Sequence, residues 1–306
     1  MAESDVAIVG GGPAGLAAAR YVLHAQLQAT IIAPELGGWV GNRFTLRGQE
    51  PVDSVWGGGL VHEFEQRVRE RPGATYVQQE ASRITRQPEG TFRITLADGS
   101  EIAARTVIVA TGARPKRLYV AGEREFWGRG VSFSAISHAP LFKDRDVAVV
   151  GSGDRALIAT LELAALARQV YLIVAQPQEL AELPLAAKVM ARPNVSLFRD
   201  WEVQEVVGDE FVTGISLVGS NGETRQVAVE GVFVQFPLLP NNELVRGLVT
   251  LDEDGHIYVN HRCETNVPGL FAAGDVTNIH AEQVLVAIGE GAKAGLSAWE
   301  YLVTLD

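Results

Sequence analysis

The residues with the clearest chemical potential stand near the start of the chain, where three glycines separate two patterned segments. Gly10, Gly12 and Gly15 follow an apolar stretch, residues 5–9, and precede an alanine-rich stretch that predicts a helix to about residue 24. The first glycine allows a tight turn, the second lets the backbone approach a pyrophosphate, and the third lets the helix press on the sheet. The spacing predicts a phosphate-binding turn at a helix N-terminus, with a merely tight strand–helix turn as the alternative.

The same pattern recurs about 140 residues later. Residues 146–150 predict a buried strand, Gly151-Ser152-Gly153 the turn, and residues 169–174 the strand that follows the helix. Two such strand–turn–helix–strand units predict two nucleotide-binding-type domains in one chain. Arg155, in the second glycine turn, leaves open that some phosphate-bearing ligand binds there.

A dinucleotide site is often completed by an acid about 20 residues after the glycines, which binds a ribose. The second strand ends at Ala33-Pro34, and the nearest acid is Glu35. Glu35 either reaches the ribose or is an ordinary solvated surface acid; both interpretations remain open.

Composition limits the other classes of function. Of 306 residues, 47% are hydrophobic and 21% charged, which suits a globular protein with a sizeable core. The net charge of −11 argues against nucleic acid as a partner. Cys263 is the single cysteine, so intramolecular disulfides and cysteine-rich metal sites are excluded, and we expect no metal. No stretch has the composition of a signal sequence or a membrane span, so the expected location is the cytoplasm, away from membranes.

The remaining segments supply the predicted frame around these motifs. Residues 74–109 and 195–234 alternate as antiparallel meanders, with turns at Asp98-Gly99 and Asn221-Gly222. A buried strand at 106–110 ends at Thr111-Gly112, and another enters a glycine turn at Gly274-Asp275. A closing helix is expected over about 281–302. We therefore predict an α/β fold.

The order of these motifs resembles the low-molecular-weight thioredoxin reductases, which are two-domain FAD flavoproteins. The resemblance covers nearly the whole chain and rests on GGGPAG at 10–15, VIVATGA at 107–113, LFAAGDV at 270–276 and EQV at 282–284. It implies two Rossmann-like three-layer domains. An FAD domain would comprise 1–117 and 243–306, and a similar, degenerate NAD(P)-binding-type domain would be inserted at 118–242.

The resemblance also implies which residues contact FAD. Asp275 matches the aspartate that bonds the ribityl chain, and Gln283 and Val284 match the helix start that faces the flavin pyrimidine ring, where negative charge develops on reduction. A helix-capping turn is the alternative interpretation of Gly274-Asp275. The implied cofactor-binding set is Gly10, Gly12, Pro13, Ala14, Gly15, Glu35, Gly37, Gly38, Ala81, Thr111, Gly112, Gly274, Asp275, Gln283 and Val284.

The chain departs from this family where family members carry a Cys-x-x-Cys pair. The matching residues are Ser134-Ala135-Ile136-Ser137, and serine hydroxyls form neither a disulfide nor a stable thiolate equivalent. The family's following acid is replaced by His138. This histidine is the candidate catalytic residue, because an imidazole beside a flavin can exchange protons near neutral pH; a hydrogen-bonded loop histidine is the alternative.

The second domain also lacks the residues that would grip NADPH. The place of the family's His-Arg-Arg run is taken by residues 174–178, VAQPQ, and no acid precedes Glu179. Ile158 and Ala159 stand where glutamates are common, and VQFP at 234–237 departs from the family pattern. We therefore expect this domain to be a scaffold rather than a working pyridine-nucleotide site.

These observations favour an FAD oxidoreductase that performs no dithiol–disulfide exchange and uses NADPH poorly. Its electrons would come from or go to a ferredoxin-like protein, a small molecule or dioxygen. A non-catalytic flavin-binding regulatory or structural protein, and an NAD(P)H-dependent enzyme with an atypical nucleotide site, are the alternatives. The resemblance further implies a homodimer formed through the FAD domain.

Overall fold

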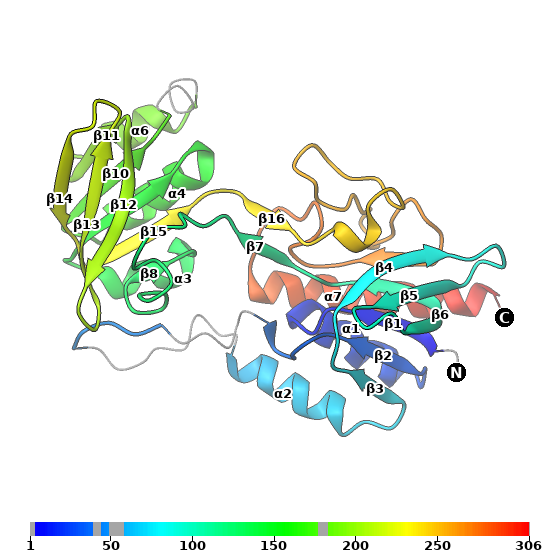
Figure 1. Ribbon diagram of the computed structural model, residues 1–306. Coiled ribbons are helices and arrows are strands. Elements are labelled where there is room, and N and C mark those ends of the chain that lie inside the picture. The colour runs from blue at the N-terminus through cyan, green and yellow to red at the C-terminus, as the bar shows by residue number, and fades with distance from the viewer. Residues whose placement is uncertain (1–3, 39–43, 49–57, 177–182, 306) are drawn as a thin grey trace. The chain divides into compact units, whose positions relative to one another are not determined.

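The computed structural model describes residues 4–38, 44–48, 58–176 and 183–305. The chain divides into two units (Figure 1). Unit one comprises 1–41, 56–114 and 239–306, and unit two comprises 42–55 and 115–238. The division differs from the expected one chiefly at 44–48, which belong to unit two because Phe44 and Leu46 are buried in its core.

Unit one is built on a seven-stranded mixed sheet. Its strand order is β3-β2-β1-β6-β5-β4, and β17 also pairs with β6. Pairing is parallel among β3, β2, β1, β6 and β17, and antiparallel from β6 through β5 to β4. The strands are β1 (Ser4–Val9), β2 (Ala29–Ile32), β3 (Ala74–Val77), β4 (Ala81–Arg86), β5 (Phe92–Leu96), β6 (Glu101–Val109) and β17 (Leu270–Ala272).

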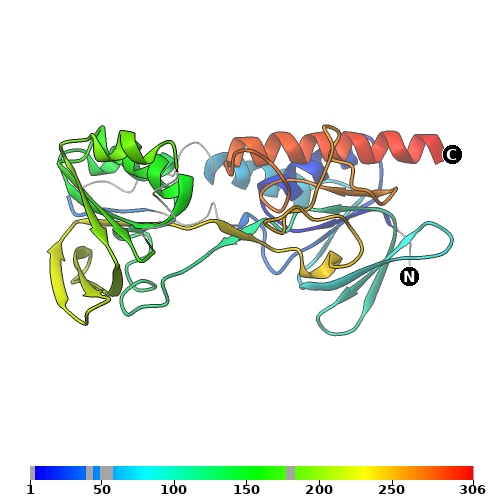
Figure 2. The same cartoon turned by 90° about the horizontal axis from the view of Figure 1, so that it is seen from above.

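Helices cover one face of this sheet. They are α1 (Pro13–His24), α2 (Gly58–Arg69) and α7 (Val284–Leu305), and α7 runs beside α1 (Figure 2). The two helix backbones can approach closely because Gly291 has no side chain. A Cβ at this position would lie only 2.0 Å from the carbonyl oxygen of Ala14. The opposite face packs on a short 3₁₀ turn, Glu243–Val245, and on the apolar residues around it.

Unit two has a parallel five-stranded sheet between two layers. The strand order is β11-β10-β9-β15-β8. Helices lie on one face, and an antiparallel meander, β12-β13-β14, lies on the other. The elements are β8 (Val131–Ser132), α3 (Ala135–His138), β9 (Asp146–Gly151), α4 (Gly153–Ala164), β10 (Gln169–Val174), α6 (Ala186–Met190), β11 (Val195–Arg199), β12 (Trp201–Gly208), β13 (Val212–Gly219), β14 (Thr224–Ala228) and β15 (Gly231–Gln235). The predicted α/β fold class is confirmed.

The strands β7 (Ala113–Pro115) and β16 (Leu238–Pro240) form a separate two-stranded sheet where the chain passes between the units. Within the described residues, none of the helices combines the length and apolar character that a bilayer crossing requires.

The contact between α1 and α7 generates a stability prediction with a matched control. Gly291→Ala should lower the free energy of unfolding by about 2 kcal/mol, because the new methyl overlaps the α1 backbone. Gly289→Ala, on the exposed side of the same helix with nothing within 4 Å, should raise it by about 0.5–1 kcal/mol through helix propensity. Urea denaturation of both variants checks this, and equal effects would contradict the packing argument.

Candidate functional site

The first glycine turn joins the end of β1 to the start of α1. A Cβ on Gly10 would lie 2.1 Å from the carbonyl oxygen of Ala110, and a Cβ on Gly15 would lie 1.9 Å from that of Gly10. These two glycines are therefore required for packing. Gly12 differs, because no atom of the described residues lies within 4 Å of the position its Cβ would take. Gly12 is also the N-cap of α1, Pro13 is the first helical residue, and the N-cap residue itself makes no side-chain capping hydrogen bond.

The loop after β2 lies against this turn. The Gly37 N–H donates to the carbonyl of Gly11 at 2.8 Å, and a Cβ on Gly38 would lie 3.1 Å from the Cα of Gly12. Both Gly37 and Gly38 have positive φ, 96° and 60°, which favours glycine. Glu35 stands just before them, exposed, and its backbone oxygen faces Gly11. The turn and the loop therefore form one surface.

Thr111 and Gly112 follow β6, beside β1. The Thr111 hydroxyl donates to the carbonyl of Asn241 at 2.6 Å, and the Asn241 side-chain amide donates to the carbonyl of Thr111 at 2.9 Å. Asn241 was absent from the sequence-based set, since a single asparagine 130 residues from its partner carries no recognisable pattern. Its two bonds fix the end of β6 where the strand leaves the sheet.

The segment after β17 completes this edge. Gly274 has a φ of 77°, and a Cβ there would lie 3.0 Å from the Ala14 side chain, so Asp275 follows immediately beside the start of α1. Val284 is the first residue of α7, and the carbonyl of Gln283 accepts the Ala287 N–H at 2.8 Å. Ala81 begins β4, which β5 and β6 separate from β1 in the sheet order. The structure thus brings the glycine turn, Gly37-Gly38, Thr111 and Gly274 together around the N-terminus of α1.

In unit two, the serines and histidine singled out from the sequence form one hydrogen-bonded cluster. The Ser134 hydroxyl donates to the Ser137 hydroxyl at 2.9 Å. Nδ1 of His138 lies 2.8 Å from the hydroxyl of Ser132, which also accepts the Ser134 N–H at 3.1 Å. The imidazole stacks on the ring of Phe44, with centroids 4.2 Å apart. This cluster can hold and orient hydrogen bonds.

Burial lowers the pKa of His138 from 6.5 to about 4. The imidazole is therefore neutral at pH 7, with one nitrogen as donor and the other as acceptor. Proton exchange near neutral pH, the role suggested by sequence, requires a pKa closer to 7 than this environment gives.

The second glycine turn has the backbone of a nucleotide site. A Cβ on Gly151 would lie 2.3 Å from the carbonyl oxygen of Gln235, and α4 begins at Gly153 without a side-chain cap. Arg155 donates to the carbonyl of Phe133 at 3.5 Å. The adjacent strand β10 ends at the buried, apolar Val174, and exposed Ala175 follows. Pro177 and Gln178 lie outside the described residues.

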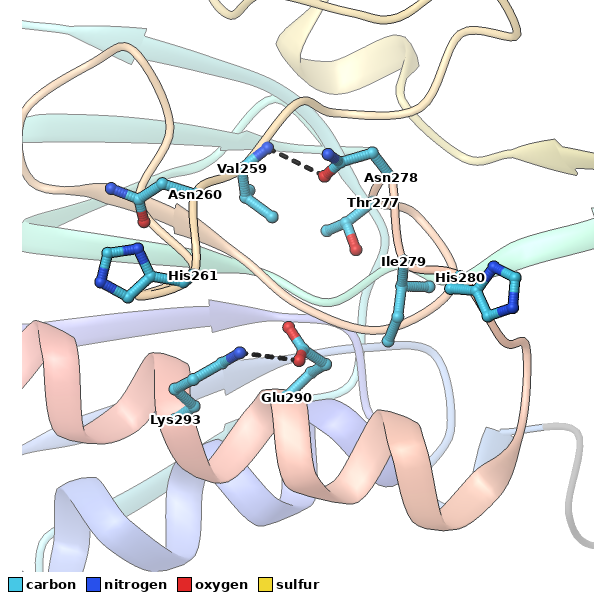
Figure 3. Close-up of a pocket in the computed structure, with 9 residues that line it drawn as sticks. All are labelled: Val259, Asn260, His261, Thr277, Asn278, Ile279, His280, Glu290 and Lys293. Atoms are coloured by element: carbon cyan, nitrogen blue, oxygen red, sulfur yellow. Dashed lines mark hydrogen bonds and ion pairs between the residues drawn. The ribbon is translucent and has the colours of Figure 1, made fainter.

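A pocket of about 260 Å³ in unit one involves residues that the sequence did not single out (Figure 3). Glu290 and Lys293 of α7 form an ion pair at 2.8 Å on one side of it, and Asn278 accepts the Val259 N–H on the other. The thiol of Cys263 donates to Glu290 at 3.1 Å. Burial, and then this carboxylate, raise the thiol's pKa, so Cys263 stays protonated. Among the described residues, no group of His, Cys, Asp or Glu is arranged to hold a metal.

Comparisons with known proteins agree on one family. The family model described as "Pyridine nucleotide-disulphide oxidoreductase" matches residues 4–291. An alkyl hydroperoxide reductase subunit, from Pseudomonas putida, is 38% identical over 302 residues, and the NADH dehydrogenase of Bacillus subtilis (strain 168) is 35% identical over 300. Each alignment covers 98% of this chain and 58% of the relative, so the chain spans little more than half the length of these relatives.

Solved structures give the same result. A thioredoxin reductase from Streptococcus pyogenes MGAS5005 aligns with a TM-score of 0.88 and 30% identity, covering 99% of both chains. A thioredoxin reductase from Giardia duodenalis aligns with the same TM-score and 27% identity, covering 99% of this chain and all of the other. The resemblance inferred from the sequence motifs is confirmed.

The buried imidazole of His138 predicts a pH-dependent stability. Because its pKa is lower in the folded state than in the unfolded state, stability is lost as the pH falls from about 6.5 to about 4. Between pH 7 and pH 5 this histidine should cost about 2 kcal/mol, and His138→Asn should remove that part of the pH dependence. Urea denaturation at the two pH values measures it, with the exposed His24→Asn as control. An NMR titration midpoint of His138 above pH 6 would contradict this assignment.

Proposed function

Because this chain belongs to the pyridine nucleotide-disulphide oxidoreductase family, we propose that it is an FAD-dependent oxidoreductase that performs no dithiol–disulfide exchange. The observation that carries the cofactor is the unfilled position beside Gly12, in front of the uncapped α1 helix. Backbone N–H groups and a positive dipole end there suit a pyrophosphate.

The surrounding residues fit FAD. Gly12 and the first turn of α1 would hold the pyrophosphate, Glu35 would lie on the adenosine side, and Asp275 would accept hydrogen bonds from the hydroxyls of the ribityl chain. The start of α7 at Gln283 and Val284 would direct N–H groups toward the flavin ring. When bound, FAD would supply two-electron and one-electron redox chemistry; the protein would bind, orient and polarise it.

The hydroxyls of Ser134 and Ser137 support the second part of the proposal, that the protein performs no dithiol–disulfide exchange. The hydroxyl oxygens of Ser134 and Ser137 are 2.9 Å apart, at the positions that match the Cys-x-x-Cys pair implied by the resemblance to thioredoxin reductases. Hydroxyls do not form a disulfide, and the thiol of Cys263 is buried and protonated. Electrons would then pass directly between the flavin and its partner: a ferredoxin-like protein, a small molecule, or dioxygen as an acceptor.

Two other functions have support. Use of a pyridine nucleotide is favoured by the 35% identity to a protein named NADH dehydrogenase and by the intact turn at Gly151. A non-catalytic flavin-binding protein is favoured by the neutral, buried His138, which leaves the serine cluster without a group that titrates near pH 7.

We also propose a homodimer formed through α7. Leu296, Trp299 and Val303 are exposed and spaced three and four residues apart on this helix, and Tyr21 of α1 is exposed as well. Such an apolar face suits a second copy of the same surface. Sedimentation equilibrium should give twice the mass of 32.9 kDa, and Trp299→Glu should yield the single-chain mass. A single-chain mass for the unaltered protein would overturn this proposal.

The cofactor site gives a prediction that separates binding from folding. Gly12→Val should lower FAD affinity at least about a hundredfold while leaving the melting temperature of the cofactor-free protein unchanged, because the side chain enters unfilled space. Gly59→Val, in α2 and equally free of neighbours, is the control and should bind FAD normally. Equilibrium dialysis with FAD measures both affinities, and normal binding by Gly12→Val would place the cofactor elsewhere.

A second prediction concerns the electron donor. NADPH should reduce the bound flavin very slowly, because the end of β10 offers Val174 and Ala175 where charged groups would bind the 2′-phosphate. Two missing charge-assisted bonds at about 1.5–3 kcal/mol each weaken binding by roughly a hundredfold or more. NADH should also react slowly, since the described residues at the end of β10, 174–176, carry no carboxylate for its ribose. Anaerobic stopped-flow mixing checks this, with dithionite as the positive control; flavin bleaching within about a second at about 100 μM nucleotide would favour the NAD(P)H-dependent alternative.

A further inference from the structure

Residues 44–48, here called the strap, make a set of contacts that the motifs did not anticipate. Although they follow the loop after β2 in sequence, they pack within unit two. The Thr45 N–H donates to the carbonyl of Gly128 at 2.8 Å, and Arg145 donates to the carbonyl of Arg47 at 3.2 Å. Phe44 and Leu46 are 2% and 3% exposed. The strap is therefore part of the core of this unit.

Phe44 covers the serine–histidine cluster. Its ring is nearly parallel to the His138 imidazole, at 22°, with centroids 4.2 Å apart, and it meets the ring of Phe142 edge-on at 5.9 Å. Nε2 of His138 is buried and has no hydrogen-bond partner among the described residues. Phe44 therefore occupies a stacking surface that a flat aromatic ligand would also use.

The covered cluster lies at the edge of the sheet where doubly wound folds bind ligands. From β9 the chain continues through β10 and β11 on one side, while β15 and β8 lie on the other, so the strand order reverses beside β9. Ligands bind outside the carboxyl ends of strands at such a reversal. The turn after β9 and the serines after β8 are both at this edge.

Gln235 adds an unused donor to the same edge. It pairs with Gly151 at the end of β15, and it lies two residues after Phe233, which packs on the helix-covered face. By strand alternation its side chain lies on that face, together with Ser132, which pairs with Phe233. Gln235 is 3% exposed, and within the described part of the chain its Nε2 has no hydrogen-bond partner. A buried amide without a partner is costly unless a ligand meets it.

We propose that the strap is an autoinhibitory cover, in which Phe44 occupies the place of a flat aromatic ligand on His138 and so closes the ligand-binding edge of unit two. This inference concerns unit two alone and does not depend on the flavin.

An exposed ion pair is the latch of the cover. Arg47 bonds both carboxylate oxygens of Asp209 at 2.5 Å, and each side chain is about 60% exposed. The Arg47 guanidinium, followed by the backbone N–H groups of Phe211 and Glu210, lowers the pKa of Asp209 to about 2. Exposed pairs contribute little to overall stability, so a latch of this kind can open without unfolding the unit.

Histidine accessibility tests whether the cover closes. At pH 7, diethylpyrocarbonate should modify His138 at least tenfold more slowly than the exposed His261 and His280, measured peptide by peptide by mass spectrometry. Phe44→Ala and Arg47→Glu should each raise the rate at His138 at least fivefold. Arg168→Glu breaks another two-bond ion pair, between the exposed Arg168 and the half-buried Asp146, and it should leave the rate at His138 unchanged.

Arg47→Glu leaves the core intact, so it keeps the test valid even if Phe44→Ala unfolds. Rapid modification of His138 in the unaltered protein would overturn the cover. Equal effects of Arg47→Glu and Arg168→Glu would overturn the latch.

Ligand affinity tests whether the cover inhibits. NAD⁺ carries a flat nicotinamide ring and cannot reduce a flavin, so it serves as the probe in isothermal titration calorimetry. The unaltered protein should bind it weakly, and Arg47→Glu and Phe44→Ala should bind it at least fivefold more tightly. An unchanged NAD⁺ affinity in a variant whose His138 has become accessible would show that the cover does not compete with a ligand. Flavin content plays no part in either readout.

Discussion

Close backbone contact at Gly15 is the constraint on which the architecture of unit one depends. Its absent side chain lets α1 approach the β1 turn so nearly that a Cβ would overlap the Gly10 carbonyl at 1.9 Å. Gly291 brings α7 onto α1 in the same way. Because both helices are held at this distance, the start of α1 is fixed at the edge of the sheet where Gly38 and Gly274 also approach it. The same close glycine contacts therefore set both the position of α1 and the geometry of the anion-binding site at its N-terminus.

Unit two shows why such a motif persists when its recognition residues differ. Gly151 is required by the carbonyl of Gln235, 2.3 Å from where its Cβ would stand, whether or not a ligand is present. At the end of β10, Val174 is buried in the core and Ala175 is exposed, so neither residue offers a charged group. A glycine pattern alone therefore reports how tightly a strand and a helix pack. The residues at the end of the next strand report what the turn recognises.

The sequence was sufficient for both strand–turn–helix–strand units and for the closing helix, because period and turn residues encode local structure. It also identified the glycines and Asp275 around the start of α1. It did not place the strap, since Phe44 contacts His138 and Phe142 about a hundred residues away and has no periodic pattern around it. Asn241 and Glu290 were missed for the same reason: their partners, Thr111 and Cys263, are distant in sequence. Burial of His138, which sets its pKa, is likewise a property of the assembled unit.

Ser134 and Ser137 have the spacing of a redox-active pair but not its chemistry. Ser134 and Ser137 keep their side chains 2.9 Å apart on one helical turn, so the fold still brings two reactive positions together. What differs is the atom: a serine hydroxyl keeps its proton and forms no O–O bond with its neighbour, whereas a cysteine thiol can ionise to a thiolate and form a disulfide. With His138 neutral, the cluster stores neither electrons nor protons near pH 7. On the proposed function, the flavin is then the only redox group of the described chain, and its substrate must meet it directly.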